Sequence, residues 1–264
     1  MDTIGVIGTG NMGGAILKGW SSLKETSLIG YDIDEQRLNK ICMELKVQKA
    51  RDIPELIQKS SYILLAVKPT QVKSLLKKYK DLFLDNHTLM SICAGIKIKK
   101  IKKWCGGKAK VVRIMPNTPA LVGKGMFAIC FEEEVDGSTH AKVIELFNVL
   151  GKCFEMEENY IDAYTALIGS GPAYIIYFLE ALVEAGVSLG FQRQISIEMV
   201  KGLLSGTTKM IEELDKSLAG LREMVTSPAG TTIAALNHFD RMAVRGAIID
   251  ALHQACKRSK ELGE

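Results

Sequence analysis

The sequence lacks the cysteine and histidine patterns that mark disulfide frameworks and zinc sites. Its six cysteines and four histidines are dispersed along the chain, and no two cysteines stand in a CxxC spacing. Because such frameworks and sites need regular spacings, we expect reduced, packed thiols and no bound metal. Reduced thiols are typical of a cytoplasmic protein, which is the location we expect.

Features of membrane, nucleic-acid-binding and secreted proteins are also missing. The apolar run Tyr174–Val187 is interrupted by Glu180 and Glu184, so no membrane-spanning segment is expected. The formal charge is only +4 and no aromatic platform accompanies the basic residues, which argues against a nucleic-acid partner. The opening residues MDTIGVIG read as a strand rather than a signal peptide. With 47% hydrophobic residues, the 264-residue chain has an ordinary globular composition.

Short apolar runs alternate with helical patterns as far as about residue 158. The predicted strands are Thr3–Ile7, Leu28–Tyr31, Tyr62–Val67, Leu89–Cys93, Val111–Met115 and Met126–Phe131. The run YILLAV is almost continuously apolar, as expected of a strand buried on both faces. Alternation of this kind predicts an α/β domain over residues 1–158, with a parallel sheet between helices.

From residue 159 to 264 the strand patterns vanish and only helical patterns remain. The predicted helices are Tyr164–Leu189, Ser196–Leu214 and Asp240–Leu262. The last of them places Val244, Ile248 and Leu252 on one face, and a lone terminal helix does not leave such a face in water. We therefore expect an all-helical second domain that packs against another copy of the chain.

A glycine-rich motif follows the first predicted strand and opens the first predicted helix. It comprises Gly8, Thr9, Gly10, Asn11, Met12, Gly13 and Gly14. Gly8 permits a tight turn, Gly10 lets the backbone approach a pyrophosphate, and Gly13 lets the helix pack closely on the strand. The free amides of the helix start favour an anion. The motif thus predicts a Rossmann-type, dinucleotide-binding domain, the alternative being a glycine-rich turn that binds nothing.

Further candidates lie at the carboxyl ends of predicted strands, where open α/β sheets bind ligands. Asp32 stands where a carboxylate accepts hydrogen bonds from the adenine ribose, and it is equally compatible with a turn that caps the next helix. The segment Ala66-Val67-Lys68-Pro69 offers Lys68, for which a surface lysine is the alternative. Small residues in Ser91-Ile92-Cys93-Ala94-Gly95 suit a flat nicotinamide ring. Asn117 lies in a loop stiffened by two prolines, a frequent place for functional residues.

Two segments stand out in the helical half. Gly169–Tyr174, with the sequence GSGPAY, interrupts one helical pattern and restarts it, since proline is favoured in a first turn. Thr226–Thr232, with the sequence TSPAGTT, opens another helix with several hydroxyls and free amides, which suits a carboxylate. Helix capping by Ser227 or Thr231 is the alternative, but it accounts for one hydroxyl and not for the cluster.

The residues missing from these segments narrow the chemistry. Reduction of a ketone produces an alkoxide and needs a positioned acid, usually histidine or lysine. None of the candidate segments contains a histidine, and Pro172–Gln194 contains no lysine. A protonated imine is already an electrophile, and hydride addition to it gives a neutral amine. The candidate site therefore favours a C=N over a C=O acceptor.

The chain resembles the pyrroline-5-carboxylate reductase family over essentially its whole length. The matching segments GTGNMGGAI, AVKP, SICAGI, RIMPNTP, ALIGSGPAYI and TSPAGTTI follow the family's order and spacing. The resemblance implies reduction of 1-pyrroline-5-carboxylate to L-proline by NADH or NADPH, the last step of proline biosynthesis. It also implies a helical domain that interlocks two chains, with dimers often assembling into larger rings.

The resemblance assigns roles to individual residues. Implied cofactor contacts are Gly8, Thr9, Gly10, Asn11, Met12, Gly13, Ala66, Lys68, Pro69, Ser91, Cys93 and Ala94. From their places at strand ends, Asp32, Val67 and Asn117 are predicted cofactor contacts as well. Implied substrate contacts are Ser227, Gly230, Thr231 and Thr232. Thr232 is the residue closest in role to a catalytic group.

The chain departs from the family pattern at two positions. Ala229 stands where the family usually has the first of the two glycines in SPGGTT, and Asp32 stands where many members carry a small or polar residue that admits a 2′-phosphate. A carboxylate repels that phosphate, whereas Arg37 is near enough to bind it, so we expect both cofactors to work, with NADH relatively better than in members without the acid.

Two alternatives remain open. One is a related imine or 2-oxo-acid reductase of the β-hydroxyacid dehydrogenase-like group, which shares the glycine-rich start and a helical second domain. Ile175 stands about where that group would carry its catalytic lysine. The other is a nucleotide-binding regulator without activity.

Overall fold

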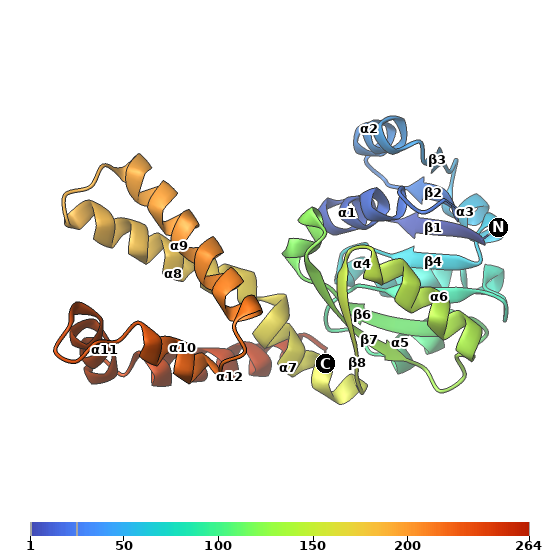
Figure 1. Cartoon of the computed structure of the whole chain (residues 1–264). Coiled ribbons are helices and arrows are strands. Elements are labelled where there is room, and N and C mark those ends of the chain that lie inside the picture. The colour runs from blue at the N-terminus through green and yellow to red at the C-terminus, as the bar shows by residue number, and fades with distance from the viewer. Residues whose placement is uncertain (1, 25, 264) are drawn as a thin grey trace. The chain divides into compact units, whose positions relative to one another are not determined.

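The computed structural model describes residues 2–24 and 26–263. The chain divides into two compact units. The first comprises Met1–Ser170 and Ala255–Glu264, and the second comprises Gly171–Gln254. The first unit holds the sheet and its covering helices, and the second is helical (Figure 1). This agrees with the predicted fold class, a Rossmann-type α/β domain followed by an all-helical domain.

In the described residues one sheet of eight strands has the order β3-β2-β1-β4-β5-β6-β7-β8 (Figure 1). Its strands are β1 (Asp2–Ile7), β2 (Thr26–Tyr31), β3 (Gln48–Lys49), β4 (Tyr62–Leu65), β5 (Thr88–Ser91), β6 (Lys110–Met115), β7 (Gly125–Phe131) and β8 (Gly151–Glu155). Pairing is parallel from β3 through β6, and β7 runs antiparallel to β6. The prediction of a parallel sheet is therefore wrong at this edge. There β7 and β8 run parallel to each other but in the opposite direction to the other six strands.

Helices cover both faces of the sheet, and each face has its own core. The helices of this unit are α1 (Asn11–Trp20), α2 (Glu35–Leu45), α3 (Ile53–Lys59), α4 (Pro69–Lys78), α5 (Ile98–Trp104), α6 (Gly137–Asn148) and α7 (Ile161–Tyr164), the last followed by a π-helical turn, Thr165–Gly169. In β4, Leu64 belongs to the core under α1 and α6, while Ile63 and Leu65 belong to the core under α3 and α4. This alternation explains why YILLAV is apolar at every position.

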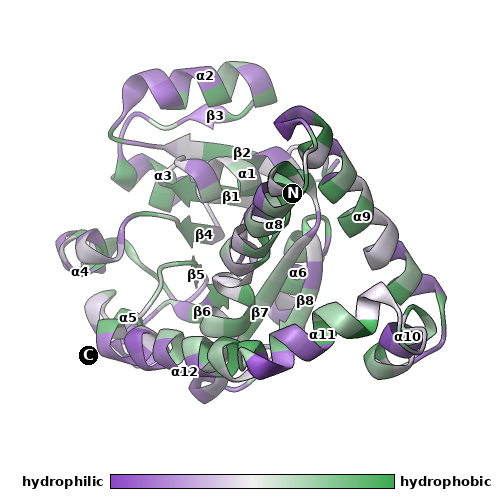
Figure 2. Ribbon diagram, turned by 90° about the vertical axis from the view of Figure 1, so that its left-hand side faces the viewer, coloured by the Kyte–Doolittle hydropathy of each residue, from purple (hydrophilic) through white to green (hydrophobic). Residues whose placement is uncertain are grey.

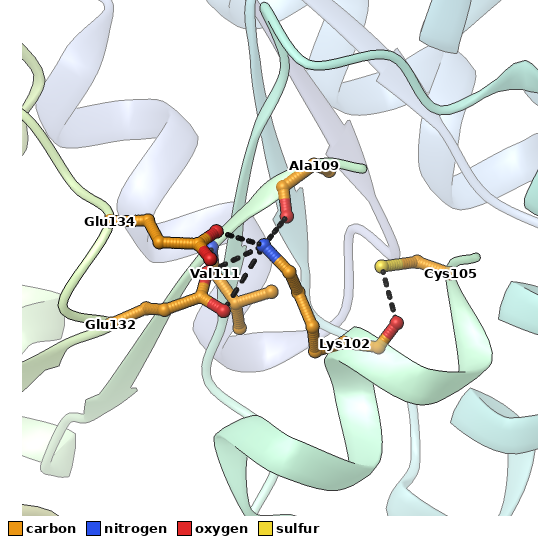
Figure 3. A network of polar contacts seen from close by, with 6 residues as sticks. All are labelled: Lys102, Cys105, Ala109, Val111, Glu132 and Glu134. Carbon is orange, nitrogen blue, oxygen red and sulfur yellow. Dashed lines mark hydrogen bonds and ion pairs between the residues drawn. The ribbon is translucent and has the colours of Figure 1, made fainter. Parts of the chain in front are cut away.

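A polar network fastens α5 to the sheet at the amino end of β6 (Figure 3). The Lys102 ammonium donates to Glu132 at 3.1 Å, to Glu134 at 2.9 Å and to the Ala109 carbonyl at 3.1 Å. Glu132 also accepts the Val111 amide at 3.0 Å. Burial alone would lower the pKa of Lys102, but the hydrogen bonds to Glu134 and Glu132 outweigh it and raise that pKa. The ion pairs are therefore fully formed at neutral pH and are lost only as the pH rises above the ordinary lysine value of 10.5.

Lys102→Met should lower the free energy of unfolding by about 1–3 kcal/mol, because Glu132 is left half-buried without its cationic partner. Urea denaturation at a fixed protein concentration measures this change. Lys103→Met is the matched control, since Lys103 is an exposed neighbour on the same helix. Equal losses for the two variants would show that the network adds nothing to stability.

The second unit exposes an unusual amount of apolar surface for a globular fold. Its helices are α8 (Gly171–Ser188), α9 (Arg193–Glu213), α10 (Leu218–Met224) and α11 (Thr231–Arg241), and α12 (Val244–Gly263) runs from this unit into the first. Ile176, Leu189, Leu203 and Ile248 are each more than half exposed. Hydrophobic residues recur along α8 and α9 in Figure 2. Patches of this size mark an interface with another chain or a membrane.

Two expectations about these helices are corrected. The predicted helix Asp240–Leu262 is two helices, because Ala243 takes a left-handed conformation (φ 52°) after α11 has ended at Arg241. The helical run Glu158–Ser188 is, by length and composition alone, apolar enough to cross a membrane, although no run was expected to approach that length. Glu180 and Glu184, which interrupt its apolar stretch, are too few to change this.

Candidate cofactor and substrate sites

The glycine loop between β1 and α1 has the geometry that its sequence predicts. Gly8 has φ 98°, and a side-chain carbon there would lie 2.6 Å from the Ala66 carbonyl oxygen. A side-chain carbon at Gly13 would lie 2.1 Å from the Gly8 carbonyl oxygen, so only glycine lets α1 pack this closely on the loop. Both positions therefore require glycine for this backbone path.

The start of α1 is open toward a ligand. A side-chain carbon at Gly10 would meet only the Arg37 guanidinium, at 3.9 Å. No side chain caps the helix, so its first backbone amides are available to an anion. Beside them lies a cavity of about 730 Å³, lined by Gly8, Gly10, Asp32, Ala66, Val67 and Lys68 among others. The loop and the cavity together fit the pyrophosphate and adenosine part of a dinucleotide.

Asp32 borders this cavity, but its carboxylate is largely engaged within the chain. Oδ2 accepts the Thr9 amide at 2.6 Å and the Thr9 hydroxyl at 3.0 Å, and Oδ1 accepts the Asp34 amide at 2.9 Å. Burial alone would raise the pKa of Asp32, but these hydrogen bonds and the charge of Arg37 outweigh it and lower that pKa. The ionised carboxylate therefore holds Thr9 of the glycine loop, whatever contact it also makes with a ribose.

Basic and polar residues that the sequence did not single out also line the cavity. Gln71, Ser74, Lys78 and Tyr79 come from α4 and the residue after it. Arg37, which the sequence did indicate as a partner for a 2′-phosphate, also lines the cavity, with its guanidinium 3.0 Å from Asp34 and 3.7 Å from Asp32. The α4 residues could have been found from the helix that Pro69 starts directly after the strand-end segment AVKP, since one face of that helix must border the same cleft.

The segment after β5 is more buried than its predicted role suggests. Ser91 is fully buried and its hydroxyl accepts the Cys93 amide at 3.3 Å. Burial raises the pKa of Cys93 to about 11, and the protonated thiol donates to the Val67 carbonyl at 3.2 Å. Ala94 is exposed, and so are Lys68 and Pro69 at the start of α4. Ser91 and Cys93 are thus buried as whole residues, and Ala94 is the exposed member of the three predicted nicotinamide contacts.

Asn117 joins three segments of the first unit. Its Oδ1 accepts the Met126 amide at 2.9 Å, and its Nδ2 donates to the Ile168 carbonyl at 3.3 Å. That carbonyl has no helical partner four residues later, because Pro172 has no N–H. The buried Asn117 side chain thus supplies a hydrogen bond to the carbonyl that is left without a helical partner at GSGP. Its role as a direct cofactor contact stays a prediction.

The hydroxyl-rich segment of the second unit forms the start of α11. Gly230 precedes the first turn, and no side chain caps it, so the amides of Thr231 and Thr232 are free. Ser227 and Thr231 are exposed and Thr232 is half-buried. A side-chain carbon at Gly230 would lie 2.3 Å from the Ser227 hydroxyl, so a larger residue there would displace that hydroxyl. Free amides and hydroxyls thus gather as predicted for a carboxylate site.

Ala229→Gly should stabilise the protein by about 0.5–1 kcal/mol. Ala229 has φ 55°, a left-handed conformation that costs an L-residue about 1–2 kcal/mol and glycine much less. The free energy of unfolding in urea, at fixed protein concentration, measures the gain. Ala247→Gly, in the interior of α12, is the control and should lose stability. A comparable loss of stability in Ala229→Gly would show that the left-handed conformation of Ala229 is not strained.

Comparison with known proteins follows the same division of the chain. Residues 3–95 match the family described as NADP oxidoreductase coenzyme F420-dependent, and residues 158–262 match pyrroline-5-carboxylate reductase dimerisation. Pyrroline-5-carboxylate reductase of Aquifex aeolicus is 33% identical over 261 residues, which cover 98% of this chain and 97% of that protein. The chain belongs to the pyrroline-5-carboxylate reductase family. The family predicted from the sequence is thereby confirmed.

Other members of the family are equally similar in sequence and in structure. The Synechocystis reductase is 36% identical over 265 residues, 99% of this chain and 98% of that protein. The crystal structure of Plasmodium falciparum pyrroline carboxylate reductase with NADP bound has a TM-score of 0.90 at 31% identity, covering 100% of this chain and 98% of that one. An imine reductase from Bacillus cereus, with 14% identity and a TM-score of 0.56, shares the fold alone. The β-hydroxyacid dehydrogenase-like alternative is not favoured.

The family match also accounts for the exposed apolar surface. The dimerisation region covers residues 158–262, which include the apolar run Glu158–Ser188 and the second unit. Apolar helix faces of this kind are stable in water when a second copy covers them. The helical region is therefore the dimerisation region of this reductase family.

Proposed function

We propose that the chain reduces the C=N bond of 1-pyrroline-5-carboxylate to give L-proline, with NADH or NADPH as hydride donor, as the last step of proline biosynthesis. The observation that carries the proposal is full-length similarity to reductases of that name, at 33–36% identity. The glycine loop with free amides beside a cavity of about 730 Å³ supports the use of a dinucleotide.

The chain's own residues bind and orient the reactants. The amides at the start of α1 and the open face of Gly10 receive the pyrophosphate. Reduced nicotinamide supplies the hydride when it is bound. The amides at the start of α11, with the hydroxyls of Ser227 and Thr231, receive the substrate carboxylate. The Thr232 hydroxyl orients the imine nitrogen.

No side-chain acid is needed in this scheme. The protonated imine carries its own proton, and the hydride adds to its carbon while the C=N π electrons move to nitrogen. The product is a neutral secondary amine, so the site gives no proton to a developing anion. This fits segments that hold hydroxyls and amides but no histidine.

The test is oxidation of NADH and of NADPH, each measured separately with 1-pyrroline-5-carboxylate as the only acceptor and with proline quantified as the product. Oxidation of both cofactors, with formation of proline, is expected. Activity with pyruvate or a hydroxy acid and none with the pyrroline would favour the β-hydroxyacid dehydrogenase-like alternative. Tight cofactor binding without any turnover would point to a nucleotide-binding regulator.

Several further features belong to the same proposal. They are a domain boundary between residues 158 and 159, assembly of dimers into a larger homo-oligomer, a cytoplasmic location, and neither nucleic-acid nor membrane partners. The exposed apolar helices support assembly, and the six free cysteines are compatible with a reducing compartment. Sedimentation velocity over a range of concentrations tests the assembly.

A further inference from the structure

The last turn of α12 packs on the loop that follows β5, within the first unit. Gly95 has φ 76°, and a side-chain carbon there would lie 2.9 Å from the Leu262 carbonyl oxygen. Conversely, a side-chain carbon at Gly263 would lie 2.9 Å from the Gly95 carbonyl oxygen. Two glycines thus allow the two backbones to touch, and neither position tolerates a side chain without a shift of the backbone.

Two polar contacts hold the helix end in this place. The Lys100 ammonium donates to the Gly263 carbonyl at 2.6 Å, where a cation also complements the negative end of the helix dipole. One turn earlier, the Ser259 hydroxyl donates to Asp162 at 2.6 Å. Ser259 is also the buried residue of α12, a helix that is otherwise largely exposed. The end of α12 is therefore anchored at Gly95, at Lys100 of α5 and at Asp162 of α7.

The anchored loop is hydrogen-bonded to a residue that lines the cofactor cavity. Gly95 ends the segment Ser91–Gly95, which is predicted to lie beside the nicotinamide. Within that segment the Cys93 thiol donates to the Val67 carbonyl, and Val67 lines the cavity. Cys93, two residues before Gly95, therefore links the anchored loop to the strand-end segment AVKP. Cavity residues near Asp32, which serve the adenosine side, lie on other segments.

We propose that the last turn of α12 is a positioning element that fixes the loop Ser91–Gly95 and thereby the nicotinamide half of the cofactor site. The inference rests on the proposed function, because it takes the nicotinamide to lie against this loop. It gives Gly95, Gly263 and Lys100 a role through the loop rather than by contact with a reactant. Misplacement of reacting atoms by about 1 Å costs rates on the order of a hundredfold, so a modest shift of the loop is measurable.

The experiment compares binding of NADH with binding of ADP-ribose, which is the same molecule without its nicotinamide, by calorimetry on the full-length protein. Gly263→Val should weaken NADH binding several-fold and leave ADP-ribose binding within twofold. Lys100→Met should act in the same direction. Glu261→Val places the same side chain in the same turn at an exposed position, and Lys99→Met removes an exposed lysine from the same helix, so both controls should match the wild type.

Turnover gives a second reading. If the chain reduces the pyrroline, Gly263→Val should lower kcat on the order of tenfold. If it does not, the proposed function fails while the binding comparison still tests the positioning role. An unchanged ratio of NADH to ADP-ribose affinity in Gly263→Val would overturn the inference. So would an equal loss of both affinities, which indicates a general loosening of the first unit.

Discussion

Thr232→Val should lower kcat by roughly ten- to a thousandfold while the affinity for NADH and NADPH stays unchanged. The range is that expected for one positioned hydrogen-bond donor lost from a reacting group. Valine has nearly the same shape as threonine, so the half-buried position at the start of α11 remains filled. Circular dichroism and cofactor titration check the fold and binding, and steady-state kinetics with the pyrroline give the effect.

Thr231→Val, the same change one residue earlier, separates two roles of the segment. Thr231 is exposed and is assigned to the substrate carboxylate, so its replacement should act mainly on KM. If both variants change KM alone, Thr232 binds the substrate but does not orient its imine. Wild-type rates in Thr232→Val would remove it from the site altogether.

The sequence predicts the sheet and the glycine loop well, because their signals are local. Alternating apolar runs identify six of the strands, and Gly8 and Gly13 are explained by the close approaches that they allow. β3 and β8 are missed, since Gln48–Lys49 is short and polar and Gly151–Glu155 is largely exposed at the sheet edge. Neither strand has the hydrophobic pattern on which the prediction depends.

The sequence does not reveal contacts between side chains and partners that are distant along the chain. The sequence places Asn117 at a strand end, but not against Met126 and Ile168, to which it is hydrogen-bonded. It marks Cys93 as small, but not as buried against Val67. It also treats α12 as a face for a partner chain, whereas the last turn of that helix packs on Gly95. Such contacts are set by the tertiary fold, which local patterns do not encode.

Asp32 illustrates how a tertiary contact changes a prediction about cofactor choice. From the sequence, its carboxylate accepts ribose hydroxyls and repels a 2′-phosphate, so removing it would favour NADPH over NADH. In the structure three hydrogen bonds from Thr9 and Asp34 occupy most of its acceptor positions. Because its pKa is held below the ordinary 3.8, the carboxylate stays ionised throughout the pH range of an enzyme assay.

Asp32→Asn should therefore lower kcat/KM with NADH and with NADPH by similar factors. Asparagine has the same shape, but its amide nitrogen cannot accept the hydrogen bonds of Thr9 or Asp34. A hydrogen bond to a charged group contributes about 1.5–3 kcal/mol, which corresponds to roughly ten- to a hundredfold in both cases if the glycine loop loses its conformation. Parallel kinetics with the two cofactors measure the factors, and a rise of NADPH relative to NADH would instead establish the ribose contact.

Arg37→Met completes this test, because the guanidinium lies at the cavity beside Gly10 and is about half exposed. If it binds the 2′-phosphate, the variant should lower kcat/KM for NADPH about tenfold and leave that for NADH nearly unchanged, as expected for the loss of a charge-assisted contact. Lys40→Met, an exposed change on the same helix, is the control. An equal effect on both cofactors would mean that Arg37 only neutralises Asp32 and Asp34, and that the 2′-phosphate is read by other residues such as Lys78 and Ser74.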